Sequence, residues 1–272
     1  MSRAGQQVLT ERDVQIVQWV YGARLATRDQ IQRLFFTAAG KSRCQERLTA
    51  LFQHRYLDRL PNRFANEPGV YLISRHATRG LQLLRTLLPD QSVAPFRVAS
   101  ARVQHILDIA SVRAVCTNAT KASDVQLLFW VNEENLADRI GSFGIIPDAY
   151  FQVSRNIGDG ERRSGFFVEV ERSAKSKRAL EERFRRYADF YYGGGYERLF
   201  GTRALRLLFV VGSDYNLSPR RHIALCRGIC ERLHFTVARF TTLDDLLNLP
   251  PDQVLTARLW QQPENPTPVS LY

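Results

Sequence analysis

Two glutamates inside an apolar run pose the first chemical question in this sequence. The segment FFVEVER, residues 166–172, alternates as a strand does, so Glu169 and Glu171 share one face while Val168 and Val170 take the other. A half-exposed strand could carry such a pair without any chemistry. Two acids on one face can also hold a divalent cation, which prefers carboxylate oxygens.

A third acid strengthens the metal interpretation. Asp148 follows Pro147 in an earlier strand-like run, residues 145–153. Adjacent strands would bring Asp148 close to Glu169, and Mg²⁺ binds through one or two carboxylates together with substrate phosphate. We therefore expect Asp148 and Glu169 to be metal ligands, with Mg²⁺ or Mn²⁺ as the cofactor and no organic cofactor.

These acids resemble the PD-(D/E)XK nuclease motif, in which two acids hold the metal and a lysine helps to activate the attacking water. Glu171 stands where that lysine should be, but Lys175 and Lys177 open the next helix. The resemblance implies a catalytic set of Asp148, Glu169, Glu171 and Lys177, and a Mg²⁺-dependent endonuclease without the usual lysine. The alternative is a nuclease core that has lost cleavage and still binds nucleic acid.

The elements around these acids predict a mixed α/β domain. A helix is expected at 96–116, and the later runs read as strands at 124–131, 145–153 and 164–172, a basic helix at 175–192, a buried strand at 204–212, a helix at 218–233 and a strand at 235–240. The predicted fold class is α/β (α+β), with a PD-(D/E)XK-like αβββαβ domain around a central mixed sheet.

The N-terminal part predicts a different, smaller module. Three capping boxes begin three helices at 11–21, 28–36 and 43–55, namely Thr10 with Asp13, Thr27 with Gln30, and Ser42 with Gln45. Two short strands at 56–60 and 70–73 then flank a turn-rich tip. This order is typical of a winged helix-turn-helix domain.

A winged helix suggests where DNA would bind, because the last of its three helices enters the major groove. The residues expected to contact DNA are Lys41, Ser42, Arg43, Glu46 and Arg47 on the third helix, Arg59 and Arg63 on the wing, and Lys175, Arg178 and Arg185 on the basic helix of the second domain. Winged helices also bind proteins, and charged helix faces are often only solvated, so both alternatives stay open.

Charge favours a polyanionic partner. The 272 residues hold 38 Lys plus Arg against 27 Asp plus Glu, a net charge of +11. We expect double-stranded DNA and no membrane, since the chain has no apolar run of about 20 residues and no signal peptide, and we place it in the cytoplasm. Four scattered cysteines predict neither a zinc site nor a disulfide framework.

The proline-containing segment at 87–96 is the expected domain boundary. It gives a winged-helix DNA-binding domain at 1–90, a nuclease-like domain at 96–250 and a C-terminal tail at 251–272. The first 95 residues hold 14 basic and 7 acidic side chains, so the smaller part carries +7 of the net charge.

Several quoted stretches resemble the replication-relaxation family of bacterial plasmids and mobile elements. They include LTERDVQIVQWV, ERLTALFQHRYLDRL, PDAYF, FFVEVERSAKS and LEERFRRYADFYY. The resemblance implies an N-terminal winged helix, a nuclease-like second domain, and a role in plasmid replication and DNA relaxation. The family's third strand ends in an acid followed by Arg, as Glu171 and Arg172 do here, and Arg183 stands where a lysine is expected in the following helix.

The leading hypothesis is a double-stranded-DNA-binding protein of a plasmid or mobile element, acting in replication, relaxation or processing, with metal-dependent cleavage as an added activity. Its expected protein partners are a second copy of the chain and replication or conjugation proteins of the element. The alternative is a winged-helix transcriptional regulator whose second domain is inactive and serves dimerisation or partner binding. A tyrosine relaxase is disfavoured because the five histidines are dispersed.

Overall fold

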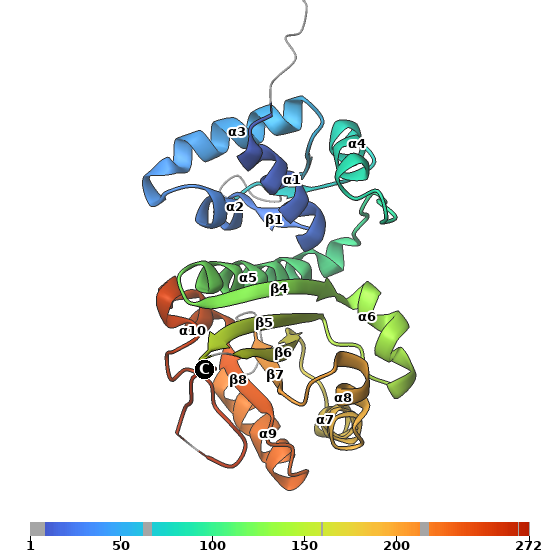
Figure 1. Ribbon diagram of the computed structural model, residues 1–272, viewed down its shortest axis with the longest axis vertical. Helices are drawn as coiled ribbons and strands as arrows, with labels where there is room; N and C mark the ends of the chain where they lie inside the picture. The colour runs from blue at the N-terminus through green and yellow to red at the C-terminus, as the bar shows by residue number, and fades with distance from the viewer. Residues whose placement is uncertain (1–8, 62–66, 159, 213–217, 266, 272) are drawn as a thin grey trace, which may run out of the picture. The chain divides into compact units, whose positions relative to one another are not determined.

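The structure is a computed structural model that describes residues 9–61, 67–158, 160–212, 218–265 and 267–271. The chain divides into two compact units, Met1–Ala114 and Val115–Tyr272. The coarse prediction of a mixed α/β protein is confirmed, with helices and a small antiparallel sheet followed by a five-stranded mixed sheet (Figure 1).

The division between the units falls inside a helix and not in the proline-containing segment. Helix α5 (Val103–Lys121) starts in the first unit, where Ala110 and Ala114 lie in its core. Gln30 fixes the same half of α5 by donating from Nε2 to the carbonyl oxygen of Leu107, 2.9 Å away. These contacts assign the start of α5 to the first unit, which sequence periodicity does not reveal.

The first unit contains three helices and a small sheet, followed by a fourth helix. In chain order the elements are α1 (Glu11–Ala23), β1 (Ala26–Thr27), α2 (Arg28–Phe35), η1 (Ala38–Gly40), α3 (Lys41–Gln53), β2 (Asp58–Leu60), β3 (Val70–Leu72) and α4 (Thr78–Leu87). The strands are antiparallel in the order β1-β3-β2. Strand β1 and helix α4 were not predicted.

Two of the three predicted capping boxes are confirmed. Thr10 accepts from the backbone of Asp13 and Thr27 from that of Gln30, and both return bonds are present. The third is wrong, because α3 begins at Lys41 and its N-cap, Gly40, makes no side-chain bond. The 3₁₀ turn η1 leads directly into α3, so Ser42 lies inside the helix and cannot cap it.

Apolar side chains from the three helices form the core of the first unit. Val17, Val20, Ile31, Leu48 and Leu51 are all buried together. At about 1.5–3 kcal/mol for each fully buried aliphatic side chain, this packing holds the three helices to the sheet. The outward face of α3 is therefore fixed in its orientation.

The second unit is built on one sheet. It contains the end of α5 and then β4 (Val125–Asn132), α6 (Glu133–Ile140), η3 (Gly141–Phe143), β5 (Ala149–Ile157), β6 (Gly160–Glu171), α7 (Lys177–Tyr192), α8 (Gly195–Phe200), β7 (Leu205–Val211), α9 (Pro219–Arg232), β8 (Ala238–Thr242), α10 (Leu243–Leu247) and η4 (Pro251–Gln253). A further 3₁₀ turn, η2 (Ser100–Arg102), precedes α5. The short helices α6, α8 and α10 were not predicted.

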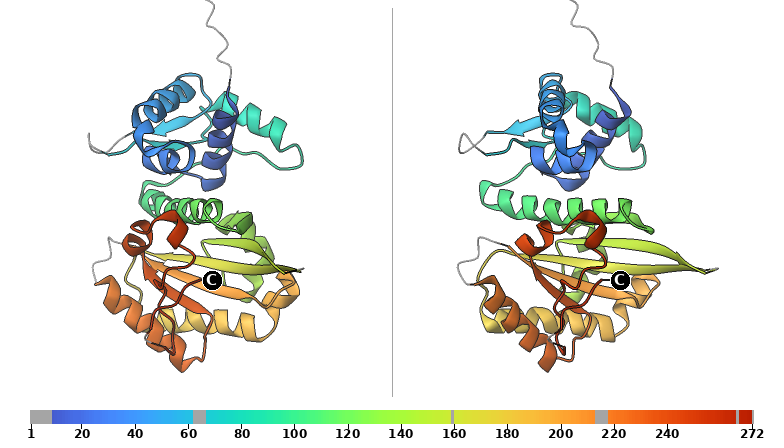
Figure 2. Two further views of the ribbon diagram at one scale, coloured as in Figure 1. Left: turned by 60° about the vertical axis from the view of Figure 1, so that its left-hand side comes forward. Right: turned by 90° about the vertical axis from the view of Figure 1, so that its left-hand side faces the viewer.

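The sheet order is β4-β5-β6-β7-β8, with the first two pairings antiparallel and the last two parallel. Helices α7 and α9 cover the same face (Figure 2), where Phe184 and Cys226 pack with Phe167 and Phe209. Strand β6 lies at the centre of the sheet. The idea of a half-exposed strand is wrong, because every residue from 165 to 171 is buried.

The C-terminal segment, predicted as a tail, packs on the second unit. Gln261 forms a bridge to Phe240 of β8, and Trp260 forms one to Val269. Trp260 is 1% exposed, so it belongs to the core. The four cysteines are free and buried. Within the described ranges, no helix is long and apolar enough to span a membrane.

Candidate functional site

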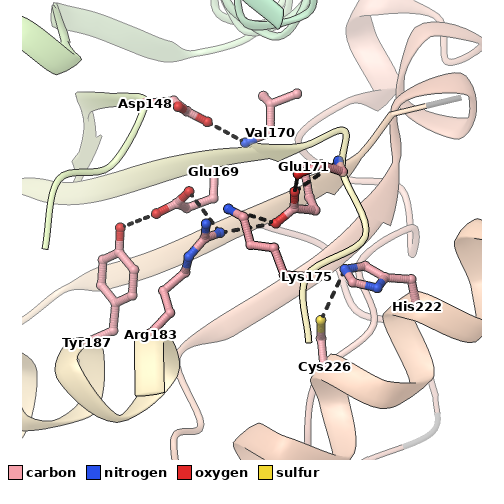
Figure 3. Close-up of polar contacts among 10 residues, drawn as sticks. Asp148, Glu169, Val170, Glu171, Lys175, Arg183, Tyr187, His222 and Cys226 are labelled. Atoms are coloured by element: carbon pink, nitrogen blue, oxygen red, sulfur yellow. Dashed lines mark hydrogen bonds and ion pairs between the residues drawn. The ribbon is translucent and has the colours of Figure 1, made fainter. Parts of the chain in front are cut away.

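Glu169 and Glu171 stand at the end of β6, and both are buried, 7% and 3% exposed. Their side chains extend from β6 toward α7 (Figure 3). Ionised carboxylates are rarely buried without partners, because removing a charge from water costs several kcal/mol. The partners of these two acids therefore define what the site can do.

Glu169 is held by two side chains of α7. The Tyr187 hydroxyl donates to its Oε1 over 2.5 Å, and Arg183 Nη1 lies 3.4 Å from its Oε2. Burial raises the pKa of Glu169 to about 7, with Asp148 and Glu171 adding to the rise and Arg183 and Tyr187 opposing it. This carboxyl group therefore keeps its proton to a higher pH than an exposed glutamate does.

Glu171 has more donors. The backbone N–H and the hydroxyl of Ser173 both donate to Oε1 over 3.1 Å. Its Oε2 lies 3.3 Å from Arg183 Nη1 and 3.2 Å from Lys175 Nζ. The same Nη1 atom of Arg183 thus contacts both glutamates, and Figure 3 shows the guanidinium between them.

Asp148 has a different environment. It lies immediately before β5, and its Oδ2 accepts a hydrogen bond of 2.7 Å from the backbone N–H of Val170. Figure 3 shows Asp148 reaching the backbone of β6, while Glu169 and Glu171 extend to the side of Arg183. The pairing of β5 with β6 begins at Ala149 and Val168, so Val170 lies beyond it. Asp148 supplies the acceptor for the backbone N–H of Val170.

These side chains do not fit a Mg²⁺ or Mn²⁺ site as arranged. Both oxygens of each glutamate already accept from a protein donor, and Arg183 supplies positive charge to both glutamates. In the described part of the chain, no group of three or more His, Cys, Asp and Glu side chains could hold a metal ion. Metal binding by Asp148 and Glu169 stays a prediction.

The cationic groups differ from those expected. Lys177, predicted to be catalytic, is the first residue of α7 and is exposed, whereas Lys175 contacts Glu171. Sequence reasoning missed Tyr187 as the partner of Glu169. Its spacing offered a signal, since Arg183 and Tyr187 are four residues apart and share one face of a helix. Arg183 and Tyr187 therefore both contact Glu169 of β6.

His222 and Cys226 of α9 lie near the same end of the sheet (Figure 3). A His222 ring nitrogen is 3.7 Å from the Cys226 sulfur, and burial lowers the pKa of His222. Burial raises the pKa of the Cys226 thiol to about 12. A protonated thiol beside a neutral ring suits packing better than nucleophilic chemistry.

The predicted DNA contacts of the first unit fall into three groups. Lys41, Ser42, Arg43 and Glu46 are exposed on α3, and Arg59 is exposed on β2. Arg47 instead binds Asp13 of α1, with Nε 2.5 Å from Oδ1 and Nη2 on Oδ2. Arg63 lies outside the described residues. The first turns of α3 are thus exposed, whereas Arg47 is held by its ion pair with Asp13.

Of the predicted contacts around α7, Arg178 is exposed, Lys175 contacts Glu171, and Arg185 pairs with Glu181 at 3.2 Å. Arg186 similarly pairs with Glu182 one turn along. Exposed pairs of this kind contribute about 0.3–0.5 kcal/mol each. Two of the five basic side chains of α7, Arg185 and Arg186, are therefore balanced within the helix.

Comparisons with known proteins agree with the resemblance seen in the sequence. Residues 17–202 match the family described as Replication-relaxation. Curated proteins give no match. Among solved structures, a restriction endonuclease FokI bound to DNA is similar at 10% identity and a TM-score of 0.30, covering 89% of this chain and 44% of that one. The chain thus spans less than half the length of that endonuclease chain.

Proposed function

Because the chain belongs to the replication-relaxation family, we propose that it binds duplex DNA of a plasmid or other mobile element and acts in its replication or relaxation. The first unit supplies the DNA-reading surface. The second unit is a nuclease-like scaffold that keeps its acids without cutting DNA.

A winged-helix assignment for the first unit is supported by its topology. Three helices are followed by a β2–β3 hairpin, and β1 joins the same sheet between α1 and α2. In this assignment α3 is the recognition helix, and β2 and β3 are strands of the wing. The first residues of a recognition helix are those nearest the bases.

The observation that carries the proposal is the exposed start of α3. Lys41 and Arg43 are exposed there, next to Ser42 and Glu46. Arginine reads guanine through two parallel hydrogen bonds, and glutamate accepts from cytosine. Lysine and the Arg59 side chain on β2 suit backbone phosphates, which fix the register of a protein on DNA.

A PD-(D/E)XK-like assignment for the second unit is supported by the position of its acids on β6 beside parallel β7. Arg183 stands between the acids in the place that a catalytic cation would take. We therefore propose a fold of nuclease type that binds and does not cleave. Metal-dependent cleavage remains the competing prediction.

The test uses the full chain with supercoiled plasmid and with short duplexes. We expect shifted duplex bands and intact plasmid in Mg²⁺ or Mn²⁺, for wild type and for Asp148→Ala and Glu169→Ala. Nicking by wild type that both variants lose would restore the nuclease. Failure of the wild type to bind any duplex at low salt would reject the proposal itself.

A transcriptional regulator is the second candidate, and the same contact of Arg183 with both acids favours it. An inactive second unit is what such a regulator requires. The two candidates differ in where the protein binds. Footprinting on plasmid DNA would place a replication protein at the origin and a regulator over a promoter.

A further inference from the structure

Two arginines lie on neighbouring strands of the sheet in the second unit. Arg206 is the second residue of β7 and Arg239 the second of β8. These strands are parallel neighbours, and Leu208 pairs with Arg239. Because side chains alternate along a strand, Arg206, Leu208 and Arg239 share one face, opposite to the face that α7 and α9 cover.

Their hydrogen bonds go to backbone carbonyls. Arg206 Nη1 donates to Leu205 over 2.9 Å, and Arg239 Nη1 donates to both Thr236 and Ala238 over 2.8 Å. These bonds fix the two guanidinium groups in place. A guanidinium has five N–H donors, so these three bonds use a minority of the ten N–H groups of the pair.

Carboxylate contacts are the next feature of this pair. Many other arginines contact a carboxylate, among them Arg28, Arg47, Arg155, Arg163, Arg183, Arg185, Arg186 and Arg203. Arg206 and Arg239 contact none in the ranges that the structure describes. Arg239 Nε is also buried without a hydrogen-bond partner there.

This arrangement is costly without an anion. Both side chains are half-buried. Burial, followed by the positive charge of Arg206, lowers the pKa of Arg239 to about 10. The group still carries its charge at neutral pH, so two like charges stay close together in partly dehydrated surroundings. A bound anion would relieve that repulsion and use the remaining donors.

We propose that Arg206 and Arg239 form a phosphate-binding site, which takes either a backbone phosphate of DNA or a small phosphorylated molecule. A phosphate group suits a pair of arginines better than a carboxylate does. Each guanidinium can donate two parallel hydrogen bonds, and a phosphate has enough oxygens to accept from both. The site lies near the starts of β7 and β8, whereas Glu171 lies at the end of β6 on the face of α7. It is therefore separate from the acids.

The first arm of the test uses inorganic phosphate. Thermal unfolding of the full chain is followed with phosphate, acetate or chloride at equal ionic strength. We expect phosphate to raise the unfolding temperature of wild type, as a ligand of the folded state does. The gain should vanish in Arg206→Gln and persist in Arg163→Gln, which removes a matched exposed arginine paired with Glu161.

The second arm distinguishes the two sources of phosphate. Duplex affinity is measured across a salt series, where each phosphate contact contributes about 0.9 to the slope of log K against log salt. A slope reduced by about one in Arg206→Gln assigns the site to DNA. An unchanged slope with lost phosphate stabilisation assigns it to a small phosphorylated molecule.

If Arg206→Gln folds poorly, Arg239→Lys provides a second variant. This change keeps the positive charge but removes the guanidinium that donates two parallel hydrogen bonds. The proposal is overturned when wild type shows neither phosphate stabilisation nor a slope that the variants change. Equal stabilisation by acetate would overturn it in favour of a carboxylate partner. Because the first arm needs no DNA, its failure is separate from failure of duplex binding by α3.

Discussion

Arg47 on α3 closes a two-pronged ion pair on the fully buried Asp13 of α1. Burial alone would raise the pKa of Asp13, but the hydrogen bonds from Arg47 and Thr10 outweigh it and hold the pKa below its usual range. An arginine that the sequence assigns to DNA therefore locks the recognition helix to its neighbour. Arg43, four residues earlier, remains exposed.

Replacing Arg47 should affect stability. Arg47→Ala leaves Asp13 buried without its cation, so the free energy of unfolding at pH 7 should fall by about 2–4 kcal/mol. Urea unfolding measures the change. The deficit should shrink as the pH falls through the pKa of Asp13, because the carboxyl group of wild type then loses its charge. An Arg47→Ala protein that is as stable as wild type but binds DNA more weakly would instead indicate that Arg47 contacts DNA.

Replacing Arg43 should affect binding. Arg43→Ala should weaken duplex affinity by about 1–3 kcal/mol if the guanidinium reaches a base edge. Its unfolding should change by less than about 0.5 kcal/mol, as for most exposed positions. Fluorescence anisotropy with a labelled duplex measures the affinity. Arg79→Ala, which removes an exposed arginine from α4, is the matched control. Equal losses in both variants would mean that only net charge matters.

Glu169 should make stability depend on pH. Its pKa is about 7 in the folded chain, against a usual 4.5. Between these values the folded state binds more protons than the unfolded state, so this group lowers the free energy of unfolding as the pH rises. The full effect is on the order of 3 kcal/mol.

Glu169→Gln should remove this dependence. As the pH rises from 4.5 to 8, the free energy of unfolding of wild type should fall relative to that of the variant. Urea unfolding across that range measures the difference. Glu231→Gln makes the same change on the exposed surface of α9 and controls for the loss of one negative charge. Parallel pH curves for wild type and Glu169→Gln would contradict the burial of this acid.

Arg183 should supply the positive charge that a metal ion would otherwise bring to Glu169 and Glu171. Arg183→Ala leaves Glu169 and Glu171 facing each other and should cost about 3 kcal/mol of stability near neutral pH. Mg²⁺ should then raise the unfolding temperature of this variant, compared with NaCl at equal ionic strength, and should leave wild type unchanged. Arg178→Ala removes an exposed arginine of the same helix as a control. Mg²⁺ stabilisation of wild type would instead indicate a working metal site.

Part of the site was open to prediction. Alternation in β6 placed Glu169 and Glu171 on the side of Phe167, and the structure shows both acids meeting α7 on that side. Their partners were not predicted. Arg183 and Tyr187 are more than ten residues away along the chain, and which face of α7 meets β6 depends on how the helix packs.

By itself, the sequence determined the order of most elements, because their signals are local. Thr10 and Thr27 cap α1 and α2 through residues three positions away, and the apolar run of β7 marks a buried strand. Only the tertiary structure decided the roles of the charges. Packing buries Asp13 and Glu169, and a buried charge takes the nearest donor that the fold brings to it, here Arg47 and Arg183.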